Sequence, residues 1–84
     1  MSTGFLLVKT SPESAREVAR DLAGIYGSSL LLVNGQGERE WDIFVQVDRP
    51  NVTAIGEEVR KVREMPPVQD TRTMIAYKIK GAIS

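Results

Sequence analysis

The sequence predicts an α+β fold whose elements follow the order β-α-β-β-α-β. Two segments carry apolar residues at helical spacing, and β-rich runs stand before, between and after them. In the run of residues 41–48 every second residue is apolar, and the opposite face also carries Phe44 at its centre. Two split β-α-β halves with right-handed crossovers predict a ferredoxin-like, four-stranded antiparallel sheet with both helices on one face.

The first half of the chain is predicted to begin with a strand and a helix. Residues 4–10 have β character, and Ser11 can cap a following helix whose first position is Pro12. This helix extends to about Tyr26, because Gly27 suits the left-handed position that ends a helix. Its expected apolar stripe consists of Ala15, Val18, Ala19, Leu22 and Ile25.

The middle of the chain is predicted to form a β-hairpin. The apolar run 30–33 is followed by the polar, turn-rich run 34–40, which leads into the strand of residues 41–48. Trp41 begins the apolar face of that strand, whereas Phe44 on the other face has no obvious cover. Small domains bury only about 60% of the surface that their unfolded chains expose. We therefore expect self-association, with Phe44 at the oligomer interface.

The second half repeats the pattern of the first. Asn51 can cap a helix that is ended by residues 65–67, which contain two prolines. The expected buried stripe is Val52, Ile55, Val59 and Val62, and the expected water-facing residues are Glu57, Glu58, Lys61 and Glu64. Residues 68–79 are rich in β-formers, so they predict either an edge strand or a strand shared with a neighbour.

Composition limits the classes of function. The 84 residues are expected to form a single domain, 1–84, and the eleven basic and eleven acidic residues are interspersed, which argues against a nucleic-acid or anionic-membrane surface. The chain has no histidine and no cysteine, so we expect neither an enzyme nor a bound cofactor. The carboxylates expected to be solvated are Glu13, Glu17, Asp21, Glu57 and Glu58. The apolar run 5–8 is too short for a signal core or a membrane span, so a cytoplasmic location is expected.

The element order is also that of the RNA recognition motif, which stacks bases on aromatic residues of its first and third strands. In the corresponding run 40–47, Phe44 and Val45 match the pattern of that motif. However, Asp42 occupies the first stacking position and Glu40 the basic position, so phosphates would be repelled. The sequence therefore argues against RNA binding.

Three stretches between residues 5 and 79 resemble a known family. They are the run Phe5-Leu6-Leu7-Val8-Lys9-Thr10 before a capped helix, the hairpin that leads through Trp41-Asp42 into an apolar strand, and the closing run Val68-Gln69-Asp70-Thr71-Arg72-Thr73-Met74-Ile75. Their order and spacing resemble the ligand-binding (RAM) domain of the Lrp/AsnC regulators. Since the chain begins at the first strand, it resembles the stand-alone members that lack the N-terminal helix-turn-helix.

This resemblance implies that two copies pack sheet to sheet, that dimers assemble into rings, and that amino acids bind near the hairpin loop and the last strand. Asp42 would accept hydrogen bonds from an α-ammonium group, while loop N–H groups and the hydroxyl of Thr71 or Thr73 would hold the carboxylate. Arg39 stands where the family usually has a glycine, and either Arg39 or Arg72 could pair with an acidic ligand. The candidate ligand-binding residues are Gly37, Arg39, Trp41, Asp42, Thr71 and Thr73.

Two functions fit the sequence. The first is an oligomeric small-molecule sensing module, with an amino acid as its ligand, that influences transcription or metabolism indirectly. The second is a ligand-free structural or partner-binding oligomer, in which Asp42 caps the hairpin, Thr71 and Thr73 are ordinary β-formers and Trp41 belongs to the core. An enzyme of the dimeric α+β barrel type ranks last, because such enzymes commonly rely on a pocket histidine.

Overall fold

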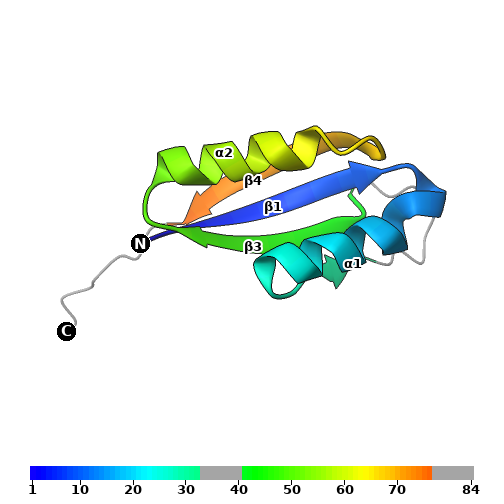
Figure 1. Cartoon of the computed structure of the whole chain (residues 1–84), viewed down its shortest axis with the longest axis horizontal. Helices are drawn as coiled ribbons and strands as arrows, with labels where there is room; N and C mark the ends of the chain where they lie inside the picture. Colours follow the sequence, from blue (N-terminus) through cyan, green and yellow to red (C-terminus); the bar gives the residue numbers. More distant parts are fainter. Residues whose placement is uncertain (33–40, 77–84) are drawn as a thin grey trace.

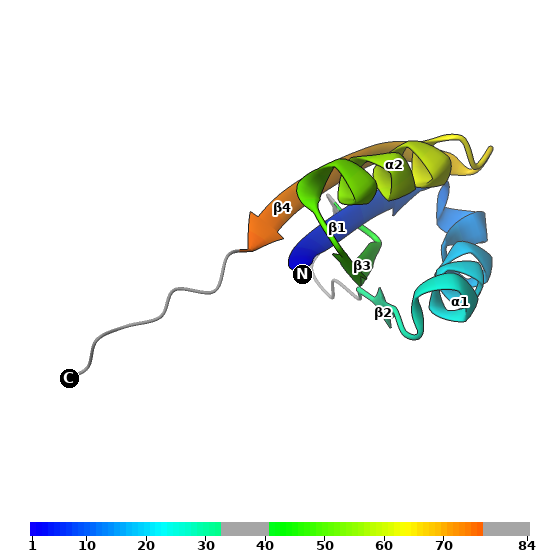
Figure 2. The same ribbon diagram turned by 60° about the vertical axis from the view of Figure 1, so that its left-hand side comes forward.

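A computed structural model describes residues 1–32 and 41–76 of the chain. In these residues the strands are β1 (Ser2–Thr10), β2 (Leu30–Leu31), β3 (Ile43–Arg49) and β4 (Val68–Ala76), and the α-helices are α1 (Ala15–Tyr26) and α2 (Val52–Arg63). A short 3₁₀ helix, Pro12–Ser14, precedes α1. Figure 1 and Figure 2 show both helices on the same side of the sheet, with α1 beside β3 and α2 beside β1 and β4.

The strands form one four-stranded sheet in the order β2-β3-β1-β4, and all neighbouring strands are antiparallel. This arrangement confirms the predicted ferredoxin-like α+β fold. The N-terminal strand β1 is therefore central, with Leu6 opposite Val45 of β3 on one side and Thr73 of β4 on the other. Of the two alternatives for the last strand, β4 lies at an edge of this sheet.

Strand alternation places the core between the sheet and the helices. The sheet contributes Leu6 and Val8 from β1 and Ile43, Val45 and Val47 from β3; α1 contributes Val18 and Leu22, and α2 contributes Val62. Each of these side chains is at most 2% exposed, and burying one stabilises the fold by about 1.5–3 kcal/mol. The predicted apolar face of the strand 41–48 is thus confirmed at Ile43, Val45 and Val47 of β3.

Gly4 allows α2 to pack closely on β1. A Cβ atom at this position would lie 2.8 Å from Cγ2 of Ile55, a buried residue of α2. Because real Cβ atoms do not approach so closely, any larger residue would push the helix or the Ile55 side chain away. The glycine therefore sets the distance between these two elements.

Several predicted boundaries differ from the structure. β1 begins at Ser2, β2 contains only two residues, and β3 begins at Ile43 rather than at Trp41. The first helix begins with a 3₁₀ turn in which Ser14 N–H donates to Ser11 C=O, and the Ser11 hydroxyl makes no capping bond. The predicted loop 34–40 and the end of the last predicted strand, 77–79, lie outside the described residues.

Two residues predicted to be buried are exposed. Ile25 is 59% exposed because Tyr26, which also follows Leu22 by about one turn, takes the place against the core. Val52 is 42% exposed. It is the first residue of α2, and helical side chains lean toward the N-terminus, so its side chain projects past the start of the helix.

The start of α2 and the end of α1 follow the sequence prediction. The Asn51 side chain accepts a hydrogen bond of 2.8 Å from Ala54 N–H and caps α2. Gly27 ends α1 with a φ of 95°, as the left-handed position requires. No helix in the described ranges is long and apolar enough to cross a membrane.

Candidate functional site

The predicted ligand residues lie in two places in the sheet. Trp41 and Asp42 directly precede β3, while Thr71 and Thr73 lie on β4, with β1 between them. Thr71 is paired with Val8, which is in turn paired with Ile43, the residue after Asp42. Thr71 therefore lies two strands away from Asp42, near the same end of the sheet. Gly37 and Arg39 lie outside the described residues.

Asp42 joins the ends of three strands. It is only 4% exposed, and its Oδ2 atom accepts a hydrogen bond of 2.9 Å from Thr10 N–H at the end of β1. Its own N–H donates to Val8 C=O at 2.9 Å, and its C=O accepts from Leu32 N–H at 2.7 Å, just beyond β2. The alternation in the predicted strand 41–48 places Asp42 on the same face as Phe44, but β3 begins only at Ile43 and the Asp42 carboxylate is buried where the strands end.

The face of the sheet opposite the helices carries a continuous apolar surface. Register places Leu30, Phe44 and Leu7 in one row across β2, β3 and β1, and Phe5 beside Met74 in the next row. We call these five residues the open-face cluster. The rings of Phe5 and Phe44 are stacked, with centroids 5.5 Å apart and an interplanar angle of 24°. Leu30 is 60% exposed and Met74 45% exposed.

Polar residues surround the open-face cluster. At one end of the sheet the Thr3 hydroxyl donates to Asp48 at 2.6 Å, and Gln46 Nε2 donates to the same carboxylate at 3.2 Å. At the other end Lys9 lies opposite Asp70 in the register of β1 and β4. An apolar centre with a polar rim is the usual anatomy of a protein interface.

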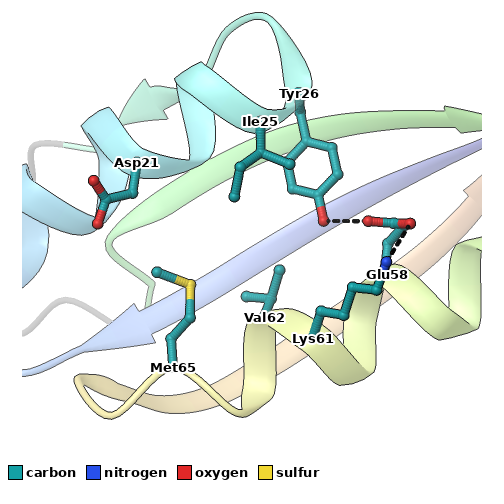
Figure 3. A pocket seen from close by; sticks show the side chains of 7 residues that line it. All are labelled: Asp21, Ile25, Tyr26, Glu58, Lys61, Val62 and Met65. Carbon is teal, nitrogen blue, oxygen red and sulfur yellow. Dashed lines mark hydrogen bonds and ion pairs between the residues drawn. The ribbon is translucent and has the colours of Figure 1, made fainter.

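The other side of the molecule contains a groove between α1 and α2. Its volume is about 470 Å³. It is lined by Asp21, Ile25 and Tyr26 of α1, by Glu58, Lys61 and Val62 of α2, and by Met65 just after α2 (Figure 3). Of the predicted ligand residues that the structure describes, none lines this groove.

Glu58 is the centre of a polar cluster at one end of this groove. The Tyr26 hydroxyl donates to Glu58 Oε1 at 2.8 Å, and Arg49 Nε and Lys61 Nζ each lie 3.5 Å from Oε2. The expectation that Glu58 is solvated was wrong, since its side chain is only 13% exposed. Arg49 also lies over the Tyr26 ring, 5.4 Å from its centroid.

These contacts change the titration of both acids. The Tyr26 hydrogen bond, helped by Arg49 and Lys61 and opposed by partial burial, lowers the pKa of Glu58 below its ordinary value of 4.5. Burial, followed by the hydrogen bond to Glu58 and its charge, raises the pKa of the Tyr26 phenol well above its ordinary value. At neutral pH the cluster is therefore an ionised carboxylate that accepts from a neutral hydroxyl. No group of three potential metal-ligating residues occurs within the part of the chain that the structure describes.

Three solved structures have the same fold over nearly the whole chain. A hypothetical protein from Pyrococcus horikoshii is 28% identical, with a TM-score of 0.78 over 94% of this chain and 93% of that one. FFRP-DM1 is 29% identical, with a TM-score of 0.78 over 92% of this chain and all of the other. A protein from Thermus thermophilus is 15% identical, with a TM-score of 0.80 over 96% and 99% of the two chains, and it supports the fold alone. No known family pattern matches the sequence, and neither does any curated protein.

FFRP-DM1 is a feast/famine regulatory protein of the Lrp family, the family that the sequence resembles. The chain has an Lrp-like fold. Within this fold, sequence reasoning found Phe44 but missed the other four members of the open-face cluster. The signal for Phe5 and Leu7 was present, because every second residue of an apolar run on a central strand must lie on the face away from the helices.

Proposed function

We propose that this chain is a self-associating regulatory module in which the open-face cluster packs against the same cluster of a second copy, and that the assembly senses an amino acid. The observation that carries the proposal is the apolar surface itself. Leu30 and Met74 stay largely exposed beside the stacked Phe5 and Phe44. Continuous apolar patches of this kind on a small domain mark interaction sites.

A second copy is the partner that fits this surface best. A two-fold interface uses the same patch on both subunits, so a patch with an apolar centre and a polar rim can pack against its own copy. The formal net charge of the chain is zero, so two copies do not repel each other strongly. As a regulator it would act on transcription or metabolism through another protein, without contacting nucleic acid directly.

Light scattering at micromolar concentration tests the assembly. We expect an oligomer for the natural chain and a monomer for Phe44→Glu, because the new carboxylate would be buried without a partner. Met74→Glu is a second variant whose position is exposed enough to leave the monomer folded. Val52→Glu, on an exposed apolar residue of α2, is the matched control and should leave the oligomer intact. A monodisperse monomer of the natural chain would contradict the proposal.

Thermal unfolding in the presence of each amino acid tests the sensing step. A ligand at a hundredfold excess over its Kd adds about 2.7 kcal/mol to the free energy of unfolding and should raise the midpoint by several degrees. Asp42→Asn should abolish the shift, because it removes the charge that would face the α-ammonium group but keeps an oxygen that can accept from Thr10 N–H. If the ligand raised the unfolding midpoint of Asp42→Asn as much as that of the natural chain, Asp42 would not be a ligand-binding residue.

A second candidate function is a structural or partner-binding oligomer without a ligand. The observation that favours it is the environment of Asp42, whose buried carboxylate already accepts a backbone hydrogen bond from Thr10. Under this function no amino acid shifts the unfolding midpoint, while the assembly still depends on Phe44. The two experiments together therefore separate the candidates.

A further inference from the structure

Figure 2 shows α1 and α2 on one side of the sheet. The groove is lined by residues of both helices, so it lies on that side, away from the open-face cluster. Packing of two copies through the open face would leave this groove exposed. Its volume of about 470 Å³ falls within the range of small-molecule sites, roughly 300–1,000 Å³. It is therefore available for a ligand that the proposed function does not include.

The middle of the groove is apolar. Val62 forms part of the hydrophobic core, and Met65 packs against that core while remaining accessible from the groove. Ile25 is 59% exposed and lines the same space from α1. In Figure 3 these three side chains lie between the carboxylates of Asp21 and Glu58. A flexible methionine beside a branched side chain can adapt to an apolar body of varied shape.

The two carboxylates at the ends of the groove differ in how they are satisfied. Glu58 is surrounded by the Tyr26 hydroxyl, Arg49 and Lys61. Asp21 makes no hydrogen bond or ion pair within residues 1–32 and 41–76, although it lines the same groove. The Glu58 end therefore holds two cations for one carboxylate, whereas the Asp21 end holds a carboxylate with no cation beside it in the described residues. A cationic group has a charged acceptor there, whereas an anion would have to compete with Glu58 for Lys61.

We propose that this groove binds a small primary amine with an apolar body, whose ammonium group donates hydrogen bonds to Asp21 and whose body lies on Ile25 and Met65. Asp21 and Ile25 are four residues apart on α1, so they lie on one face of the helix about one turn apart. An alkylamine a few carbons long reaches from the carboxylate across Ile25. The Glu58 cluster closes the far end of the site.

Hexylamine is the probe for this site. Amide signals of the isotope-labelled protein are followed by nuclear magnetic resonance as hexylamine is added to about 10 mM, which detects a Kd near 1 mM. We expect shifts concentrated in residues 21–26 and 58–65. Asp21→Asn should weaken binding at least roughly fivefold, because it removes the charge from the acceptor. Glu17→Gln, which neutralises an exposed acid one turn earlier on α1, is the matched control and should change affinity less than about twofold.

Hexanoate distinguishes recognition of the amine from simple apolar contact. It has the same apolar body with the opposite charge, and we expect it to bind at least roughly fivefold more weakly than hexylamine. Equal binding of hexanoate, shifts spread over the whole chain, or full affinity in Asp21→Asn would each overturn the proposal. Binding should persist in Phe44→Glu, so failure of this site and failure of self-association are seen separately.

Discussion

At the scale of single residues, Asp42 shows how a buried carboxylate can be structural and still be a candidate ligand residue. The turn before β3 brings its Oδ2 atom within 2.9 Å of Thr10 N–H, where β1 ends. An unpaired backbone N–H at that buried place would cost free energy comparable to a lost hydrogen bond. The carboxylate removes that cost.

Asp42→Ala should lower the free energy of unfolding by about 1–3 kcal/mol, because it leaves the buried Thr10 N–H without an acceptor. Urea denaturation measures the change. Asp42→Asn should cost clearly less, because the amide oxygen can still accept. Asp48→Ala, on an exposed residue of β3, is the control and should cost at most about 1 kcal/mol. Equal effects of the alanine and asparagine substitutions at position 42 would contradict this assignment.

The Glu58 cluster predicts a pH dependence. Because the pKa of Glu58 is lowered in the folded state, its ionised form stabilises the fold above the ordinary pKa of 4.5. This contribution is lost as the pH falls through the lower, folded-state pKa. The natural chain should therefore exceed Glu58→Gln in stability by about 1 kcal/mol near neutral pH, and this difference should shrink as the pH falls below the ordinary pKa of 4.5.

Urea denaturation of both chains across this pH range checks the prediction. Glu57→Gln is the matched control, since its neighbouring carboxylate is 53% exposed and pairs only with Arg60 on the surface. It should change the free energy of unfolding by at most about 0.5 kcal/mol near neutral pH. A difference for Glu58→Gln that grows as the pH falls would reverse the sign and refute the argument.

At the scale of elements, α2 and the first helix begin in different ways. Asn51 caps α2 through its side chain, whereas Ser11 contributes only its C=O. Asn51→Ala should therefore lower the free energy of unfolding by about 1 kcal/mol, and Ser11→Ala by a few tenths at most. Chemical denaturation of the two variants measures both costs. Similar losses at both positions would show that the Asn51 bond contributes nothing specific.

Two glycine-to-alanine substitutions, one in β1 and one in α1, should change the free energy of unfolding in opposite directions. Gly4→Ala should destabilise the fold by about 1–3 kcal/mol, because the new Cβ would collide with Ile55. Gly24→Ala, within α1, meets no atom within 4 Å and should stabilise the fold by up to about 1 kcal/mol through helix propensity. Thermal denaturation gives the two signs directly. Stabilisation by Gly4→Ala would mean that α2 lies further from β1 than described.

The sequence was sufficient for the order and type of the elements because their apolar periods are strong and local. Val18 and Leu22 on α1, and Ile43 and Val45 on β3, all occupy the predicted faces. Which of two neighbours faces the core is decided by contacts between elements, as Ile25 and Tyr26 show. Tyr26 is held by Glu58, thirty-two residues away, and no local period contains that information.

The candidate site was harder to predict from the sequence for the same reason. Phe44 could be identified because a polar strand face with a central phenylalanine is unusual. The rest of the open-face cluster could be identified only from the strand register, which brings Leu30 and Met74 beside the phenylalanines across three strand pairings. The groove could be found only from the spacing of α1 and α2 in space, because the two helices are far apart in the sequence. That the predicted ligand residues bind an amino acid remains a prediction.

At the scale of the whole molecule, no helix or strand among residues 1–32 and 41–76 covers the second face of the sheet. Self-association through that face links stability to protein concentration, since only the folded chain can form the interface. Each tenfold increase in concentration adds about 1.4 kcal/mol per dimer to the free energy of unfolding. The unfolding midpoint of the natural chain should therefore rise by a few degrees per tenfold increase.

Calorimetry over a range of concentrations measures this dependence. Met74→Glu should lose it, because the charge blocks the open face, whereas Val52→Glu should keep it. A midpoint independent of concentration in the natural chain would mean that the fold is stable as a monomer and that the exposed apolar face has another partner.

The central position of β1 has a consequence for biosynthesis. This strand is made first, but its two partners in the sheet, β3 and β4, are made much later, and β4 is the last strand described. In a nascent chain the run from Phe5 to Val8 can pair with β3 along one edge, but its other edge stays unpaired until Val68–Ala76 has emerged from the ribosome. Its folding is dominated by contacts between distant parts of the chain, which form slowly. An interruption of synthesis before β4 therefore leaves one edge of β1 exposed, and unpaired strand edges favour aggregation.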